Sequence, residues 1–233
     1  MTGLIALVFL LAPSPTPPPA AAMSPVQVVD EVQLAYSKVR DVSATFSQTY
    51  VDKLRGRRRM ETGQMWAKKD GRVRWSYRDP VRKDFVFDGK TAYFYEPENA
   101  QVTVFERFED SALSNAVRFL WGQGDLRSAF DIKSCVKKCD QGEEGDHIVS
   151  LWPKENLPTV DHILLVVDPT NYRVRKSIAF DPLGNRTEYR LTDFNGDVVV
   201  ADKKFAFKVP EGVSVLRHAV EDEKTVPPKT NLR

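Results

Sequence analysis

The stretch TGQMWAKKDGRVRWSYRDPVRKDFVFDGKTAYFYEPENAQVTVF, residues 62–105, decides the fold class of this chain. It contains β-rich runs separated by turn-forming residues: Gln64–Lys69, Arg72–Tyr77, Asp84–Phe87, Thr91–Tyr95 and Gln101–Phe105. Two of the breaks are the pairs Asp70-Gly71 and Asp88-Gly89. An Asp-Gly pair between two such runs is a strong hairpin signal, because glycine accepts a positive φ without steric cost. The stretch therefore predicts an antiparallel meander.

The same stretch is rich in aromatic side chains. Its aromatic residues are Trp66, Trp75, Tyr77, Phe85, Phe87, Tyr93, Phe94, Tyr95 and Phe105. Successive residues of a strand face opposite sides of the sheet, so several of these side chains must lie on each face. One aromatic face can pack on helices, and a second one needs another layer or a ligand.

Four short motifs follow one another through this region. They are Gly63-x-x-Trp66-x-Lys68-Lys69, Arg74-Trp75-x-Tyr77, Asp88-Gly89-Lys90-Thr91-x-x-x-Tyr95-x-Pro97 and Gln101-Val102. In order and spacing they resemble the periplasmic outer-membrane lipoprotein carrier family, LolA. The resemblance extends upstream to Val39–Gln48 and downstream to Phe205–Val213, and it covers most of residues 26–216.

The resemblance implies a fold and a function. The implied fold is mainly β: a strongly curved, incompletely closed antiparallel β-barrel of about eleven strands, with helices covering its mouth. The implied function is to accept the acyl chains of lipoproteins from an inner-membrane ABC-type exporter and shield them across the periplasm of a Gram-negative bacterium. An outer-membrane receptor would then take them over. We expect a monomer that needs no cofactor and no metal.

The two ends of the chain differ in composition from the rest. Leu4–Leu11 is an apolar run, and Ala20-Ala21-Ala22 is typical of a signal-peptidase site, so residues 1–22 are predicted to be a signal peptide. Residues 23–220 form the predicted carrier domain, and the polar residues 221–233 a disordered tail. The formal net charge of +2 gives no reason to expect a nucleic-acid partner.

Two amphipathic helices are predicted, at Ser24–Arg40 and Glu109–Gly122. Ser24 can cap the first helix, and Pro25 suits its first turn. The second helix is a candidate lid over the barrel, with an apolar face that includes Leu113, Val117, Leu120 and Trp121. The alternative is ordinary packing of that helix on the sheet.

The remaining chain alternates between β-rich runs and turns. Asp41–Val51 precedes the meander, and the later predicted strands are Phe130–Val136, His147–Trp152, His162–Asp168, Arg173–Phe180, Thr187–Phe194 and Val198–Phe207. The basic run Arg55–Arg59 is interpreted as a solvated hairpin tip or, alternatively, as a docking patch for an acidic partner.

One strand face should line the lipid cavity. Val73, Trp75 and Tyr77 share a face of their strand, and we assign them to the cavity. Met65 and Ala67 belong there only if a bulge or a longer loop shifts the register by one residue. With a two-residue turn at Asp70-Gly71 they would face the other way.

Lys69 is predicted to contact the lid. The family usually carries an arginine followed by proline at this point, and the resemblance implies that this arginine binds backbone carbonyls of the lid. Here the pair is Lys69-Asp70. Lysine presents three donors on a flexible stem, whereas arginine presents five in a planar fork, so a looser lid is expected. The alternative is that Lys69 is an exposed residue beside a turn.

Cys135 and Cys139 are the only cysteines, and in an exported protein such a pair favours a disulfide. In an extended strand their Cα atoms would be about 13 Å apart, so the bond requires a turn between them. Free thiols are the alternative, and a metal site lacks further ligands at suitable spacing.

No sequence motif of an enzyme is present, and no catalytic residue is assigned. There is no Gly-x-Ser-x-Gly, phosphate-binding glycine loop or His-Glu-x-x-His, and the three histidines are interpreted as exposed turn residues. Two alternatives to a carrier stay open. One is a lipid-responsive sensor or general lipid binder on the same scaffold, and the other is a secreted hydrolase that uses Asp and His.

Overall fold

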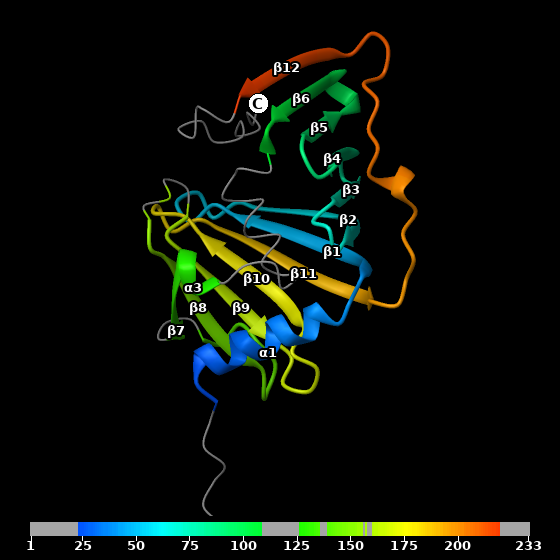
Figure 1. Cartoon of the computed structure of the whole chain (residues 1–233). Helices are drawn as coiled ribbons and strands as arrows, with labels where there is room; N and C mark the ends of the chain where they lie inside the picture. Colours follow the sequence, from blue (N-terminus) through cyan, green and yellow to red (C-terminus); the bar gives the residue numbers. More distant parts are fainter. Residues whose placement is uncertain (1–22, 109–125, 136–138, 156, 158–159, 220–233) are drawn as a thin grey trace, which may run out of the picture.

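The protein is built around one strongly curved β-sheet. A computed structural model describes residues 23–108, 126–135, 139–155, 157 and 160–219. Within them, twelve strands form one sheet in the order β12-β6-β5-β4-β3-β2-β1-β11-β10-β9-β8-β7 (Figure 1). The edge strands β12 and β7 do not pair with each other, so the barrel stays open. The predicted fold class is confirmed, with twelve strands in place of about eleven.

The helices and strands follow the chain in a simple order. The first half holds α1 (Pro25–Ser37), β1 (Asp41–Val51), β2 (Arg58–Lys68), β3 (Val73–Asp79), β4 (Lys83–Phe87), β5 (Ala92–Glu96) and β6 (Gln101–Glu106). The second half holds α3 (Leu126–Ala129), β7 (Phe130–Ser134), β8 (His147–Pro153), β9 (His162–Val167), β10 (Val174–Phe180), β11 (Arg186–Asn195) and β12 (Ser214–Ala219). Short 3-10 turns lie at Pro97–Asn99 and Asp202–Lys204.

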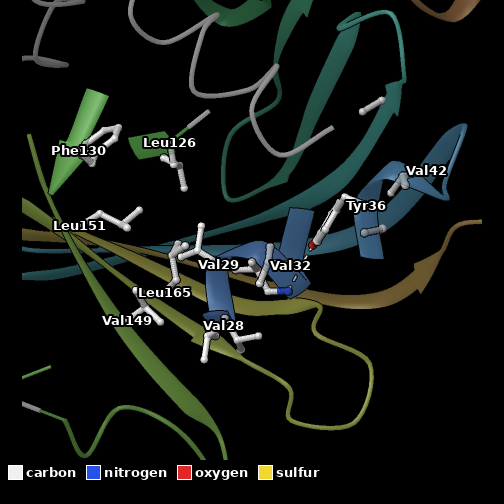
Figure 2. Packing of buried hydrophobic residues seen from close by; sticks show 14 of the residues in the cluster. Val28, Val29, Val32, Tyr36, Val42, Leu126, Phe130, Val149, Leu151 and Leu165 are labelled. Atoms are coloured by element: carbon white, nitrogen blue, oxygen red, sulfur yellow. Dashed lines mark hydrogen bonds between the residues drawn. The ribbon is translucent and has the colours of Figure 1, made fainter. Parts of the chain in front are cut away.

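Helix α1 begins where the sequence predicts. The Ser24 hydroxyl accepts a hydrogen bond from the Gln27 amide, and the Gln27 side chain accepts one from the Ser24 amide, which together form a capping box. The helix buries Val28, Val29 and Val32 against the inner face of β7–β9 (Figure 2). Helix α1 therefore occupies part of the concave side of the sheet.

The second predicted helix, Glu109–Gly122, lies outside the described residues. A covering of the barrel mouth by two helices therefore stays a prediction. The predicted signal peptide and C-terminal tail also lie outside the described part of the chain. Among the described residues, no helix combines the length and apolar character needed to cross a membrane.

The β2–β3 connection settles the register that the sequence left open. The Lys68 amide donates to the Arg72 carbonyl, and the Gly71 amide to the Lys68 carbonyl, so the loop has three residues. Gly71 has a φ of 93°, which favours glycine. As a result Met65 pairs with Trp75 and Ala67 with Val73. The longer loop places the apolar side chains of both strands on one face.

Gly63 allows the sheet to close around an aromatic side chain. It pairs with Phe46 of β1 and Tyr77 of β3, next to a register irregularity between Thr62 and Gly63. A Cβ at Gly63 would lie 2.7 Å from the Phe46 ring and would also collide with the Ser76 carbonyl. Glycine is required here because the Ser76 carbonyl and the Phe46 ring both lie against the backbone at this position. That ring is fully buried, with its centre 4.6 Å from Trp75 and 4.9 Å from Tyr77.

The predicted strand at Val198–Phe207 is wrong. These residues belong to an outer connection, residues 196–213, that crosses the convex side of the sheet from β11 to β12 (Figure 1). Their apolar pattern reflects packing on the sheet in place of strand pairing: Phe205 is buried, and Phe207 lies 5.1 Å from Tyr93.

The end of this connection also corrects the predicted topology. Strand β12 was not predicted, and it pairs in parallel with β6, whereas the other strand pairs are antiparallel. A parallel neighbour requires a crossover between the two strands, and the outer connection supplies it.

Polar contacts fasten the outer connection to motif positions of the meander. Asp202 accepts from Lys68 at 2.6 Å and from Arg72 at 3.1 Å. The Lys204 ammonium lies 3.6 Å from the centre of the Trp66 ring, which is a cation–π contact. The side chains of Trp66 and Lys68 therefore lie on the outer face of the sheet and bind the outer connection, while those of Met65 and Ala67 face inward.

Cys135 and Cys139 form a disulfide in the structure, with Cα atoms 5.7 Å apart. Strand β7 ends at Ser134, one residue before Cys135, so the bond lies beyond the extended segment. The two cysteines therefore do not both lie in an extended strand, which is the condition for a disulfide between residues four positions apart.

We predict that Gly63→Ala will destabilise the fold by about 1–3 kcal/mol, because the added methyl group collides with the Ser76 carbonyl and with the Phe46 ring. Denaturant unfolding monitored by circular dichroism measures this. The matched control is Gly56→Ala, which has a φ of 65° but no atom within 4 Å of the added carbon and should cost about 1 kcal/mol through backbone strain alone. In a Phe46→Leu background the part of the Gly63→Ala cost that comes from the ring should disappear, while the clash with the Ser76 carbonyl remains. An unchanged cost there would contradict the proposed clash with the ring.

We predict that alkylation without reductant will label neither cysteine, and that reduction will expose both to the reagent. Intact-mass measurement before and after reduction decides this. Reduction should lower the free energy of unfolding by about 2 kcal/mol, since the closed loop is short. Two labelled thiols in the unreduced protein would overturn the assignment.

Candidate functional site

The concave face of the sheet is the candidate ligand site. The register places Met65 and Ala67 of β2 beside Val73, Trp75 and Tyr77 of β3. All five side chains belong to one apolar cluster together with α1. Met65, Ala67 and Val73 are buried, while Trp75 and Tyr77 are partly exposed. The structure brings these predicted residues together, and ligand contact by them stays a prediction.

The inner face continues across β4–β6, where the sequence analysis assigned no site residue. Trp75 pairs with Phe85, and Phe85 with Phe94, so these rings share one face. Phe105 lies further along this face, opposite Ala92. Phe85, Phe94 and Phe105 are each partly exposed. Alternation within each strand shows which residues share a face of that strand. Only the pairing between the strands shows that Phe85, Phe94 and Phe105 lie on the same face of the sheet.

Phe108, just after β6, packs across these rings. Its centre lies 5.7 Å from that of Phe85, 5.2 Å from Phe87 and 6.3 Å from Phe105. This cluster is separate from the one that contains α1. The concave face therefore has two apolar parts, one filled by α1 and the other lined by phenylalanine.

Several hydrogen-bonded polar side chains lie at one end of this face. Glu61 of β2 is buried, and its carboxylate binds Lys83 at 2.8 Å and Arg59 at 2.6 Å. The Tyr77 hydroxyl donates to Gln48 at 2.7 Å and shares a hydrogen bond with Tyr189. Burial raises the pKa of Tyr77, and it raises the pKa of Tyr189 to about 12, so both stay neutral donors at physiological pH.

The polar end borders a pocket of about 440 Å³ between the ends of β3 and β4. Its lining residues are Ser76, Tyr77, Arg78, Arg82, Lys83, Asp84 and Pro97. The concave face therefore runs from buried aliphatic side chains at Met65 and Ala67 to charged ones at Lys83. An elongated molecule with one apolar and one polar end would match this gradient.

Lys69 contacts a helix end. Its ammonium donates to the Ser37 carbonyl at 2.9 Å, at the C-terminal end of α1. The Lys69 amide also donates to the Arg40 carbonyl at 2.7 Å. A cation at this end of a helix binds unpaired carbonyls and interacts favourably with the helix dipole. Its predicted partner was the other helix, and the lid residues Leu113, Val117, Leu120 and Trp121 lie outside the described residues.

His162 is placed differently from the prediction. His162 begins β9 and stacks between two rings, 4.6 Å from Trp152 and 4.5 Å from Phe180, in place of lying in an exposed turn. Its Nδ1 atom lies 2.7 Å from Asp161. Both faces of this imidazole are covered by rings, which fits a packing role. Within the described residues, no group of three or more His, Cys, Asp or Glu side chains could hold a metal ion.

An open, curved sheet around a helix defines the class of this protein, a half-barrel with an apolar concave face. The family model described as "Outer membrane lipoprotein carrier protein LolA" matches residues 37–208. The chain therefore belongs to the LolA family, as its motifs indicate.

Two relatives named outer-membrane lipoprotein carrier protein show the extent of the match. The one from Chromobacterium violaceum is 27% identical over 198 residues, covering 84% of this chain and 90% of the relative. The one from Nitrosomonas europaea is 27% identical over 214 residues, covering 92% and 98%. The crystal structure of an uncharacterized conserved protein from Thermus thermophilus has the same fold, with a TM-score of 0.51, 12% identity, and coverage of 83% of this chain and 98% of the other.

We predict that Phe94→Ala will lower the affinity for a fluorescent fatty acid about tenfold, because it removes an apolar ring from the concave face. The matched control is Tyr95→Ala on the same strand, whose ring faces outward against Phe207. Fluorescence titration of both variants measures the effect, and thermal unfolding confirms that both are folded. Equal loss of affinity in the two variants would show that the concave face is not the site.

Proposed function

We propose that this protein is a periplasmic carrier that binds the acyl chains of lipoproteins in its concave apolar face. It would receive them from an inner-membrane exporter of the ABC type and deliver them to a receptor at the outer membrane. The observation that carries the proposal is that apolar side chains of β2 to β6 share the inner face, in a chain that matches the carrier family over most of its length.

The energetics of acyl chains favour such a face. Each methylene removed from water contributes about 0.8 kcal/mol, so a lipoprotein cannot cross an aqueous compartment with its acyl chains exposed. Phe85, Phe94 and Phe105 offer partly exposed rings for this contact. The polar end at Glu61 and Lys83 could receive the headgroup side of the lipid.

Release requires a competitor for the same surface. Helix α1 already fills the half of the concave side that includes Val149, Leu151 and Leu165 (Figure 2). A helix that moves over the aromatic half would displace lipid in the same way, which is the role we propose for Leu113, Val117, Leu120 and Trp121. Lys69 could then hold helix backbone carbonyls, as it holds the Ser37 carbonyl of α1.

The remaining parts of the proposal concern location and assembly. The apolar run and alanine triplet within residues 1–22 are the basis for export to the periplasm of a Gram-negative bacterium. The carrier would act as a monomer with neither cofactor nor metal, and it would not be an enzyme. Its family is named for carriage rather than for a reaction.

We predict that native mass spectrometry of the protein, purified from its own cells without detergent, will detect bound triacylated peptide or protein. The Phe94→Ala variant should retain less of it than the Tyr95→Ala variant. Free phospholipid alone, in equal amount on both variants, would favour a general lipid binder. Absence of any bound lipid, together with turnover of a soluble ester, would contradict the proposal and favour a hydrolase.

A further inference from the structure

A leucine protrudes at the tip of the β1–β2 hairpin, among cationic side chains. Leu54 is 90% exposed, and residues 53–58, KLRGRR, are all exposed. Within the described part of the chain, Lys53, Arg57 and Arg58 have no ion-pair partner. The carrier function proposed above uses none of these residues.

The tip is held in a defined shape. The Asp52 amide donates to the Arg57 carbonyl at 2.9 Å, and the Asp52 carboxylate accepts from the Arg55 amide and guanidinium at 2.9 and 3.1 Å. Gly56 takes a φ of 65° within the turn. Asp52 itself is buried. Leu54 is therefore presented to solvent by an ordered turn.

A second exposed leucine lies on the neighbouring turn. The β10–β11 turn presents Leu183, which is 73% exposed. The Lys53 amide donates to the Asn185 side chain at 2.9 Å, and Val51 pairs with Arg186, so the two turns lie side by side (Figure 1). Together they form a leucine tip, defined as residues 52–58 and 181–185, in which two highly exposed apolar side chains lie among positive charges.

We propose that the leucine tip docks this protein on an anionic phospholipid membrane, with Leu54 inserted among the acyl chains and Lys53, Arg57 and Arg58 at the headgroups. The charge complementarity is direct, because each cation near an anionic lipid surface adds to binding. Apolar side chains next to lysine and arginine are also the combination by which amphipathic segments bind at a membrane interface.

A membrane suits this tip better than an acidic protein. Leu54 and Leu183 are single apolar side chains among charged ones, whereas the buried centre of a stable protein interface is a contiguous apolar surface. A protein partner would also need a pocket for Leu54, whereas a bilayer accepts an apolar side chain at any position on its surface.

Docking would also orient the concave face. Along β1 and β2 the pairs run from Gln48–Glu61 through Tyr50–Arg59 to Val51–Arg58 at the hairpin tip. The polar end at Glu61 and Tyr77 therefore lies at the same end of the sheet as the leucine tip. A docked protein would turn that end toward the bilayer. This last point rests on the proposed carrier function, whereas the docking does not.

Vesicle flotation of the full mature chain, stripped of lipid, tests the proposal. The vesicles contain phosphatidylcholine alone or with about one-third phosphatidylglycerol. We expect binding to the anionic vesicles only, weakening with added salt. Arg57→Gln with Arg58→Gln should reduce partitioning about 25-fold, close to fivefold for each charge. The matched control, Lys203→Gln with Lys208→Gln, removes two exposed charges elsewhere and should leave partitioning within about twofold.

Insertion is tested separately from charge attraction. Leu54→Ala should lower partitioning about tenfold, whereas Leu34→Ala, at a half-exposed leucine on α1, should have no effect. An environment-sensitive dye on Leu54→Cys, attached without reductant, should brighten with anionic vesicles. Phe94→Ala should bind vesicles as the unchanged protein does, so failure of the carrier function and failure of docking give different results.

Three outcomes would overturn the proposal. The first is equal binding to neutral and anionic vesicles, or no binding. The second is indistinguishable behaviour of Leu54→Ala and Leu34→Ala, which would leave charge attraction without insertion. The third is retention by an immobilised acidic polypeptide, sensitive to the same variants, with no binding to vesicles.

Discussion

The contact of the Phe46 ring with the backbone of Gly63 is the constraint on which the rest of the structure depends. The ring is fully buried and touches Trp75 and Tyr77, so it links β1, β2 and β3 at one point. A side chain at position 63 would separate these strands. Next to this position the register between β2 and β3 shifts. The absence of a side chain at position 63 therefore lets the three strands pack closely beside this irregularity.

Local signals predicted most of the fold, and long-range pairing decided the rest. Ser24 and Pro25 marked the start of α1, and the Asp-Gly pairs marked two turns, because each depends on a few adjacent residues. The sequence could not decide between a two-residue and a three-residue loop at Asp70-Gly71, and that choice alone determines which way Met65 faces. The pattern of Val198–Phe207 was misread as a strand because packing on a sheet and pairing within one bury similar side chains.

The candidate site was also predictable only in part, because only some of its residues are brought together by a local pattern. Val73, Trp75 and Tyr77 share a face by simple alternation, so their common placement needed no knowledge of the fold. Phe85, Phe94 and Phe105 join that face only through the pairing of four strands. The outer contacts of Trp66 and Lys68 with Lys204 and Asp202 join residues more than 130 positions apart and carry no local signal. These motif positions secure the scaffold from its convex side, while their neighbours supply the concave surface.

The central position of β1 has a consequence for how the chain folds. One neighbour of β1 is β2, joined by a hairpin, but the other is β11, where Tyr50 pairs with Thr187. The early hairpins can form as soon as they are synthesised, whereas the middle of the sheet must wait for nearly the whole polypeptide. Strand β12 comes later still, since it reaches β6 only after the outer connection has crossed the sheet. Such non-local pairing slows folding, because chain entropy is lost before the contacts form. A slow folder remains unfolded longer after synthesis, which is the state in which a polypeptide can be threaded through a narrow membrane channel.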